Sequence, residues 1–184
     1  MKKIISIFFV AVWAMASMSS CGGDEAEFDK KLQTAFNEME KTNSLSIHMC
    51  AETIIAWGDA IYKDVTPSGK RCNDFNEALD EVFSSFRDTG LYDSLEIYKK
   101  NMEIATSKLN NPPSSRKECY DDFVNIVSEV SSFSRMADNP YGNYKSFESE
   151  ARNKLENIAK DVDNFKIKYA EYIKLEDLQK ESSE

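Results

Sequence analysis

Hydrophobic residues recur at intervals of three and four along most of the chain after residue 27. The runs are Phe28, Leu32, Ala35 and Met39; Ile47, Cys50, Ile54, Trp57 and Ile61; Phe75, Leu79, Val82 and Phe86; Leu91, Leu95, Tyr98, Met102, Ala105 and Leu109; Cys119, Phe123, Ile126, Val130, Phe133 and Ala137; and Phe147, Ala151, Leu155, Ile158, Val162, Phe165, Tyr169 and Tyr172. In an α-helix this spacing places the side chains on one stripe, which is buried against other helices. No run alternates with a period of two, so the sequence predicts an all-α fold.

Helix-breaking residues are scarce and clustered, and they divide the pattern into four main segments. The proline sites between the segments are Pro67, Pro112 with Pro113, and Pro140. Short connections favour antiparallel neighbours, so we predict an up-down antiparallel helical bundle. A bend or break is expected at Gly90. A weaker break at Thr42-Asn43-Ser44 would leave an additional short N-terminal helix over residues 28–39.

Two of the predicted helices resemble each other. Cys50 and Cys119 are followed by apolar residues at the same offsets, and Pro-x-Gly turns follow at Pro67 and Pro140. This favours two related helical hairpins, although shared heptad spacing alone would give the same offsets. Helices joined by tight turns can bury their stripes within one chain, so we expect a monomer rather than a coiled coil between chains.

The N-terminal residues have the three zones of a secretory signal peptide. Lys2 and Lys3 are followed by an apolar stretch that runs to Met18, and small residues precede Cys21. The alternative is a transmembrane anchor, since residues 4–23 are uncharged and long enough to span a bilayer. The Ser- and Gly-rich end of this stretch and the acidic residues after it favour a signal peptide over residues 1–20.

Met18-Ser19-Ser20-Cys21 resembles the lipobox of bacterial lipoproteins, in which an apolar residue and two small residues precede the modified cysteine. Met18 and Ser20 depart from the commoner Leu and Gly or Ala. The resemblance implies a diacylglycerol on the Cys21 thiol and a third acyl chain, such as palmitate, on its amine. Three acyl chains would hold the protein firmly in a lipid bilayer.

The residues after Cys21 bear on the location and on the domain boundaries. Gly22 stands where Asp would resemble an inner-membrane retention signal, so an outer-membrane location is favoured. The acidic cluster at Asp24, Glu25 and Glu27 resembles the surface-export signal of some Gram-negative lineages, which favours the cell surface over the periplasmic face. We expect residues 21–27 to form a lipidated flexible tether, residues 28–178 a single bundle domain, and residues 179–184 a disordered tail.

The mature chain is strongly acidic. Loss of residues 1–20 removes Lys2 and Lys3 from 23 basic residues and leaves all 32 acidic residues, for a net charge of −11. Such a chain repels phosphate backbones, so nucleic acid is not an expected partner. It also repels anionic lipid headgroups, so the acyl chains on Cys21 are the expected contact with the membrane.

The sequence predicts no metal ligands, cofactor-binding residues or catalytic residues. His48 is the single histidine, Leu45 stands where a Glu-x-x-His motif needs Glu, and no Cys-x-x-Cys motif occurs. Cys50, Cys72 and Cys119 are expected mainly as small buried hydrophobes, while a Cys50–Cys119 disulfide stays open. Acidic pairs such as Asp121 with Asp122, Glu148 with Glu150, and Asp161 with Asp163 fall between stripe positions and are expected to face water.

Four functional hypotheses remain. The favoured one is a non-enzymatic binding or interaction module at the outer membrane or cell surface, with a protein or carbohydrate partner. The second is an envelope structural or immunity-type protein that neutralises a cationic partner, and its support is the net charge. The third is a carrier of a hydrophobic small molecule in the bundle core. An enzyme would need a core pocket with two buried carboxylates.

Overall fold

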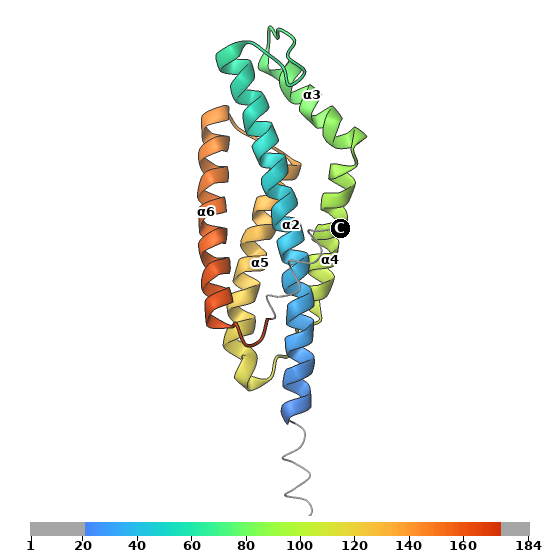
Figure 1. The fold of residues 1–184 in the computed structure, drawn as a ribbon, viewed down its shortest axis with the longest axis vertical. Helices are drawn as coiled ribbons and strands as arrows, with labels where there is room; N and C mark the ends of the chain where they lie inside the picture. Colours follow the sequence, from blue (N-terminus) through green and yellow to red (C-terminus); the bar gives the residue numbers. More distant parts are fainter. Residues whose placement is uncertain (1–20, 174–184) are drawn as a thin grey trace, which may run out of the picture.

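The computed structural model describes residues 21–173 as an all-α bundle (Figure 1). Its elements are α2 (Cys21–Lys63), α3 (Phe75–Asp88), α4 (Leu91–Ser107), the short 3₁₀ helix η1 (Ser114–Arg116), α5 (Lys117–Asp138) and α6 (Tyr144–Lys168). Helix α2 runs the length of the bundle, α3 and α4 return along it one after the other, and α5 and α6 form a second antiparallel pair. The predicted all-α, up-down architecture is confirmed. The predicted signal peptide and C-terminal tail lie outside the described residues.

Helix α2 is one uninterrupted helix of 43 residues, so the predicted break at Thr42-Asn43-Ser44 and the separate short N-terminal helix are wrong. Two hydroxyl groups turn inward and bond to carbonyls of the preceding turn: Thr42 Oγ1 donates to the Glu38 carbonyl at 2.9 Å, and Ser46 Oγ donates to the Thr42 carbonyl at 2.7 Å. Both side chains are fully buried. Burial against the bundle therefore outweighs the low helix propensity of this segment.

Residues 21–27, which we expected to form a flexible tether, are part of α2. The segment is helical because its side chains have partners: Glu27 pairs with Lys31 at 2.7 Å, and Glu25 pairs with a residue of η1. Phe28, in the next turn, is buried in the core. The N-terminal end of α2 is thereby joined to the rest of the bundle.

The break at Gly90 is confirmed. Gly90 lies between α3 and α4 with φ 72° and ψ 19°, a left-handed conformation that side chains with a Cβ atom adopt at a cost. Before it, the Thr89 side chain donates to the Ser85 carbonyl and closes α3. This change of direction lets α3 and α4 follow α2 as two successive pieces (Figure 1).

The two Pro-x-Gly turns close two helical hairpins, α2 with α3 and α4, and α5 with α6. Gly69 and Gly142 both have positive φ, 78° and 87°. The first connection is a loop pinned by the Val65–Arg71 bridge. The second is short and leads into α6 through a capping box at Asn143. The hairpin arrangement is thus observed, while a common origin of the two hairpins remains a prediction.

The core is made mainly of the predicted stripes. Its centre is an aromatic cluster in which the Phe36 ring lies 5.8 Å from that of Phe165 and 6.4 Å from that of Phe123. The stripe prediction fails at the distal end of the bundle, where Ile61 is 43% and Phe75 is 42% exposed. No helix in residues 21–173 is long and apolar enough to cross a membrane.

Candidate functional site at the N-terminal end of α2

Cys21, the predicted lipidation site, lies in the first turn of α2. This turn is at the end of the bundle where α5 begins and α6 ends (Figure 1). The side chain of Cys21 is outside the described part of the chain, so its lipidation stays a prediction. The residues around this end show how the start of α2 is held.

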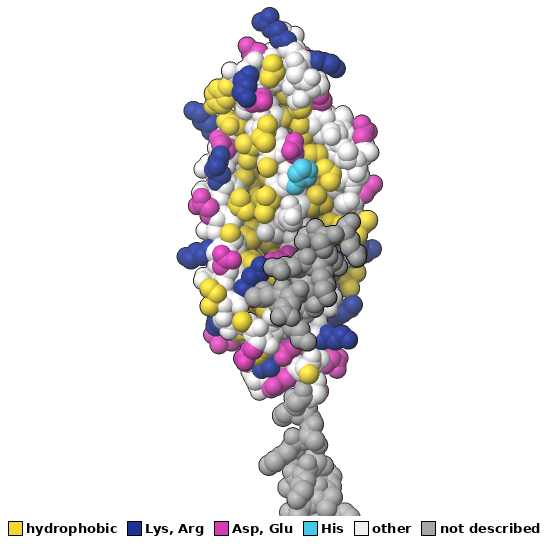
Figure 2. Space-filling view, in the orientation of Figure 1, with side chains coloured by type: hydrophobic (Ala, Val, Ile, Leu, Met, Phe, Trp, Pro, Cys, Tyr) yellow, Lys and Arg dark blue, Asp and Glu magenta, His cyan; other side chains and the backbone are white. Residues whose placement is uncertain are grey.

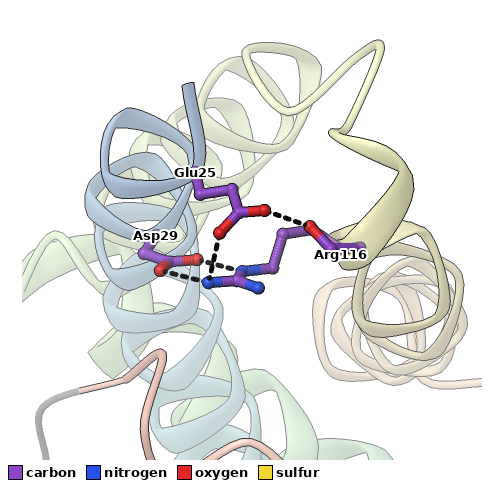
Figure 3. Close-up of polar contacts among 4 residues, drawn as sticks. Glu25, Asp29 and Arg116 are labelled. Atoms are coloured by element: carbon purple, nitrogen blue, oxygen red, sulfur yellow. Dashed lines mark hydrogen bonds and ion pairs between the residues drawn. The ribbon is translucent and has the colours of Figure 1, made fainter. Parts of the chain in front are cut away.

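Glu25 and Asp29 lie one helical turn apart on α2 and both face Arg116 of η1 (Figure 3). The guanidinium donates from Nε to Asp29 Oδ1 at 2.9 Å and from Nη2 to Asp29 Oδ2 at 3.1 Å. Its Nη2 also lies 3.5 Å from Glu25 Oε2, and the Ser115 hydroxyl donates to Glu25 Oε1. The planar guanidinium thus binds one carboxylate through two parallel hydrogen bonds, the strongest geometry for such a pair.

A third segment completes this cluster. The guanidinium carbon of Arg116 lies 3.9 Å from the centre of the Tyr172 ring, which follows α6. The Arg116 side chain is only 13% exposed and that of Asp29 only 23%. The hydrogen bond to Asp29 raises the pKa of Arg116 above its already high value, so the positive charge is permanent. Arg116 therefore ties the first turns of α2 to η1 and to the chain after α6.

A second charged cluster lies nearby at the end of α6. Lys168 Nζ contacts Glu118 Oε1 and Asp122 Oδ2, each at 2.8 Å, and the Tyr169 hydroxyl donates to the same Asp122 oxygen at 2.7 Å. The hydrogen bond from Lys168 lowers the pKa of Asp122. Asp122, predicted to be solvated, is therefore half-buried and paired, whereas its neighbour Asp121 is exposed as predicted. Both clusters join helix ends and border open pockets. Asp122 and Lys168 line one of about 220 Å³ between α5 and α6, and Asp29 and Tyr172 line one of about 600 Å³ beside the first turns of α2.

The residues with catalytic or ligating chemistry are not brought together. His48 is exposed on α2, and Cys50, Cys72 and Cys119 are unbridged and buried. Burial raises the pKa of Cys50 and of Cys119 to about 12, so both thiols are neutral and unreactive at physiological pH. Within residues 21–173 no group of three His, Cys, Asp or Glu side chains is arranged to hold a metal ion.

The buried polar residues of the described chain all carry hydroxyl groups: Thr42, Ser46, Thr53, Thr66 and Ser134. The pair of buried carboxylates that an enzyme hypothesis requires is not found among them. Glu148 is paired with Arg152, and Glu150 accepts a hydrogen bond from Tyr141. These contacts stabilise α6 and the turn before it, and none of them places an acid next to a base in a pocket.

Sequence reasoning missed the Arg116 cluster, because Arg116 and Asp29 are 87 residues apart in the chain. The available signal was a basic residue three positions after Pro113, with two acids one turn apart near the start of another helix. Spacing alone does not reveal which helix ends meet.

Comparison of the chain with models of protein families, with curated proteins and with solved structures finds no match. The sequence and geometry of the chain define an all-α, up-down bundle with a charged cluster that fixes the end carrying Cys21.

Proposed function

We propose that this protein is a lipoprotein anchored in the outer membrane through acyl chains on Cys21, facing the cell surface, and that it acts as a non-enzymatic interaction module. The observation that supports this most is the continuity of α2, which spans Cys21–Lys63 without interruption. At 1.5 Å per residue this helix is about 64 Å long. Cys21 and the loop after Lys63 are at opposite ends of the bundle (Figure 1), so an anchor at Cys21 leaves the other end free for a partner.

The Arg116 cluster supports a defined presentation of the bundle. Glu25 lies one helical turn after Cys21 and is bonded to Ser115 and Arg116. An anchor at Cys21 is therefore attached to a helix end that is fixed to η1 and, through Arg116, to Tyr172. The bundle and its anchor move together, in contrast to a domain on a long disordered linker.

A second candidate function is neutralisation of a cationic partner at the envelope, as an immunity-type protein would do. The net charge of −11 for the mature chain favours it, because complementary charge accelerates association. Deletion that leaves both toxin sensitivity and envelope integrity unchanged would remove this candidate.

Replacement of Cys21 tests the anchor. In the source organism, Cys21→Ala is expected to abolish processing and to leave an unlipidated precursor with residues 1–20 attached. The wild-type protein is expected to incorporate a fatty-acid analogue and to partition into detergent, and protease treatment of intact cells reports its exposure at the surface. Cys50→Ala is the matched control and should leave labelling and partitioning unchanged, since Cys50 is buried within α2.

Two outcomes would contradict the anchor. If the Cys21→Ala protein is still cleaved near residue 21 and released in soluble form, the N-terminal segment is an ordinary secretory signal. If the wild-type protein retains residues 1–20 and stays bound to the membrane, that segment is a transmembrane anchor.

A further inference from the structure

The open pocket between α5 and α6 has a polar rim and an apolar floor, and we call it the α5–α6 pocket. Its polar lining residues are Asp122, Asn125, Asp161, Asn164 and Lys168. Its apolar lining residues, Ile126 and Phe165, are almost fully buried, so they form the floor. Figure 2 shows one face of the bundle, whose upper part is covered mainly by apolar side chains. The α5–α6 pocket differs from that surface in offering several hydrogen-bonding groups at one place.

The rim of the pocket is built from one spacing that occurs on both helices. Asp122 and Asn125 are three residues apart on α5, and Asp161 and Asn164 are three residues apart on α6. Residues at this spacing share one face of a helix, so each helix contributes a carboxylate and an amide to the pocket. Lys168, two helical turns after Asp161, adds an ammonium group.

One of these side chains is already held in place. Lys168 Nζ and the Tyr169 hydroxyl both donate to Asp122 Oδ2, at 2.8 and 2.7 Å. The hydrogen bond from Lys168 lowers the pKa of Asp122, so this carboxylate is ionised at physiological pH. Neither of the two hydrogen bonds uses Oδ1, which keeps its capacity to accept from a ligand. A side chain that is fixed before binding loses less conformational entropy when a ligand arrives.

The other three rim side chains are unpaired. Asn125, Asp161 and Asn164 are exposed and form no hydrogen bond or ion pair with any other residue in 21–173. Asn and Asp are poor helix formers that often compensate by bonding to a nearby backbone group. Here they stand in the interior of two long helices without such a bond. Helix stability and local hydrogen bonding therefore do not account for these residue types, whereas a ligand in the pocket does.

The charges and hydrogen-bonding groups select a class of ligand. Two carboxylates against one ammonium group disfavour an anion. A metal ion is disfavoured because Lys168 already binds Asp122, and no group of three His, Cys, Asp or Glu side chains in the described chain is arranged to hold one. A hydroxyl group both donates and accepts, so it suits a rim in which carboxylates accept, an ammonium group donates and amides do both. A ring with neighbouring hydroxyls and an apolar C–H face matches both the rim and the floor.

We propose that the α5–α6 pocket binds a neutral carbohydrate, with hydroxyl groups of one sugar ring bonded to the Asp-x-x-Asn pairs of both helices. The pocket volume of about 220 Å³ is below the range of about 300–1,000 Å³ that drug-sized ligands occupy, which limits the contact to about one ring. This deepens the proposed function by naming a class of partner, and it rests on that function for the exposure of the pocket to ligands outside the cell.

An anchor at Cys21 leaves the pocket clear of the bilayer. Lys166, two residues before Lys168 on α6, lies 2.6 Å from Glu40 of α2. Glu40 is 19 residues after Cys21, or about 28 Å along the helix. The headgroup region of a bilayer is only about 5–8 Å thick on each side. Asp161 lies still further from the anchored end, because α6 runs back towards it (Figure 1).

The test uses unlipidated chain 21–184, labelled with nitrogen-15 and kept reduced. Two-dimensional NMR records the side-chain amide signals of Asn125 and Asn164, which report directly on the pocket. Glucose, galactose, mannose and N-acetylglucosamine are titrated separately, with calcium chloride and sodium phosphate in parallel. At least one sugar is expected to shift both signals saturably, with a dissociation constant in the millimolar range, and neither salt should do so.

Two matched variants of α6 locate the binding surface. Asp161→Ala removes a rim carboxylate and is expected to weaken sugar binding about tenfold or more, the loss for one hydrogen bond to a charged group. Asp163→Ala removes an exposed carboxylate that does not line the pocket and should leave the affinity unchanged. Alanine is a better helix former than Asp, so neither variant should lower the thermal stability. Asn125→Ala, followed through the Asn164 signal, is a second rim variant.

The proposal is overturned if no sugar of the panel shifts the two signals, if Asp161→Ala binds like the wild type, or if Asp163→Ala weakens binding equally. It is also overturned if calcium or phosphate alone gives saturable shifts, since the pocket would then be a site for that ion. The titration needs no acyl chains, so its failure leaves the Cys21 labelling experiment untouched. A failure of the labelling experiment likewise leaves the titration valid.

Discussion

Replacement of Arg116 by alanine removes the contacts that hold the first turns of α2. The lost contacts are two hydrogen bonds to Asp29, the ion pair with Glu25 and the stacking on Tyr172. Asp29 would be left without its positive partner in a position where its side chain is 23% exposed. The variant therefore measures how firmly the end of the bundle near Cys21 is fixed.

The expected magnitude follows from the burial of the pair. Exposed ion pairs contribute about 0–1 kcal/mol, and breaking a fully buried pair costs about 3–5 kcal/mol. The Arg116 and Asp29 side chains are 13% and 23% exposed, which places the pair between these limits. We expect Arg116→Ala to lower the free energy of unfolding by about 2–3 kcal/mol, in line with charged hydrogen bonds of about 1.5–3 kcal/mol.

The assay is urea unfolding followed by circular dichroism, together with hydrogen exchange of the amides in residues 23–29. The control is Lys117→Ala, which removes an exposed pair with Asp121 worth about 0.3–0.5 kcal/mol. Exchange of residues 23–29 should accelerate in Arg116→Ala and not in Lys117→Ala. A double-mutant cycle with Asp29→Ala should give a coupling of at least about 1 kcal/mol. If Arg116→Ala costs no more than Lys117→Ala, or the cycle shows no coupling, the argument that this cluster fixes α2 is refuted.

Three further predictions concern the core and the turns. Phe123→Ala should lower the free energy of unfolding by about 3–5 kcal/mol, since the ring is fully buried between those of Phe36 and Phe165. The described core would be contradicted if Phe123→Ala lowered the free energy of unfolding by less than Ile97→Ala, a change at an exposed isoleucine. Gly90→Ala should cost about 1–2 kcal/mol because φ is 72° and no atom lies within 4 Å of an added Cβ, whereas Gly90→Asn should cost less; equal stability of all three proteins in urea would argue against the left-handed turn. Cys50 and Cys119 should resist alkylation at pH 8 until the chain unfolds, as read by mass spectrometry. Because their pKa rises from 9.0 to about 12 on folding, the folded chain holds these protons more tightly. The contribution of the two thiols to the free energy of unfolding is therefore fully present below pH 9 and is lost between pH 9 and pH 12. Rapid native-state labelling would show that the thiols are not buried.

The sequence alone determined the helices and most of the residues that they bury. The intervals of three and four set the helical period, and they identified core residues such as Phe123 and Ile158, which are fully buried. Gly90 and the Pro-x-Gly turns marked changes of direction, because backbone conformations with positive φ are local properties of the residue that adopts them. Antiparallel packing followed from the shortness of the connections.

Tertiary structure decided the features that depend on distant neighbours. Local propensity favours a break at Thr42, and burial of its hydroxyl against the bundle keeps α2 helical there. Local charge favours a solvated tether at residues 21–27, and Arg116, which is remote in the chain, binds it instead. The interval pattern encodes the period of each helix, whereas the helix ends that meet, and so the remote charges that pair, are set by how all the helices pack together.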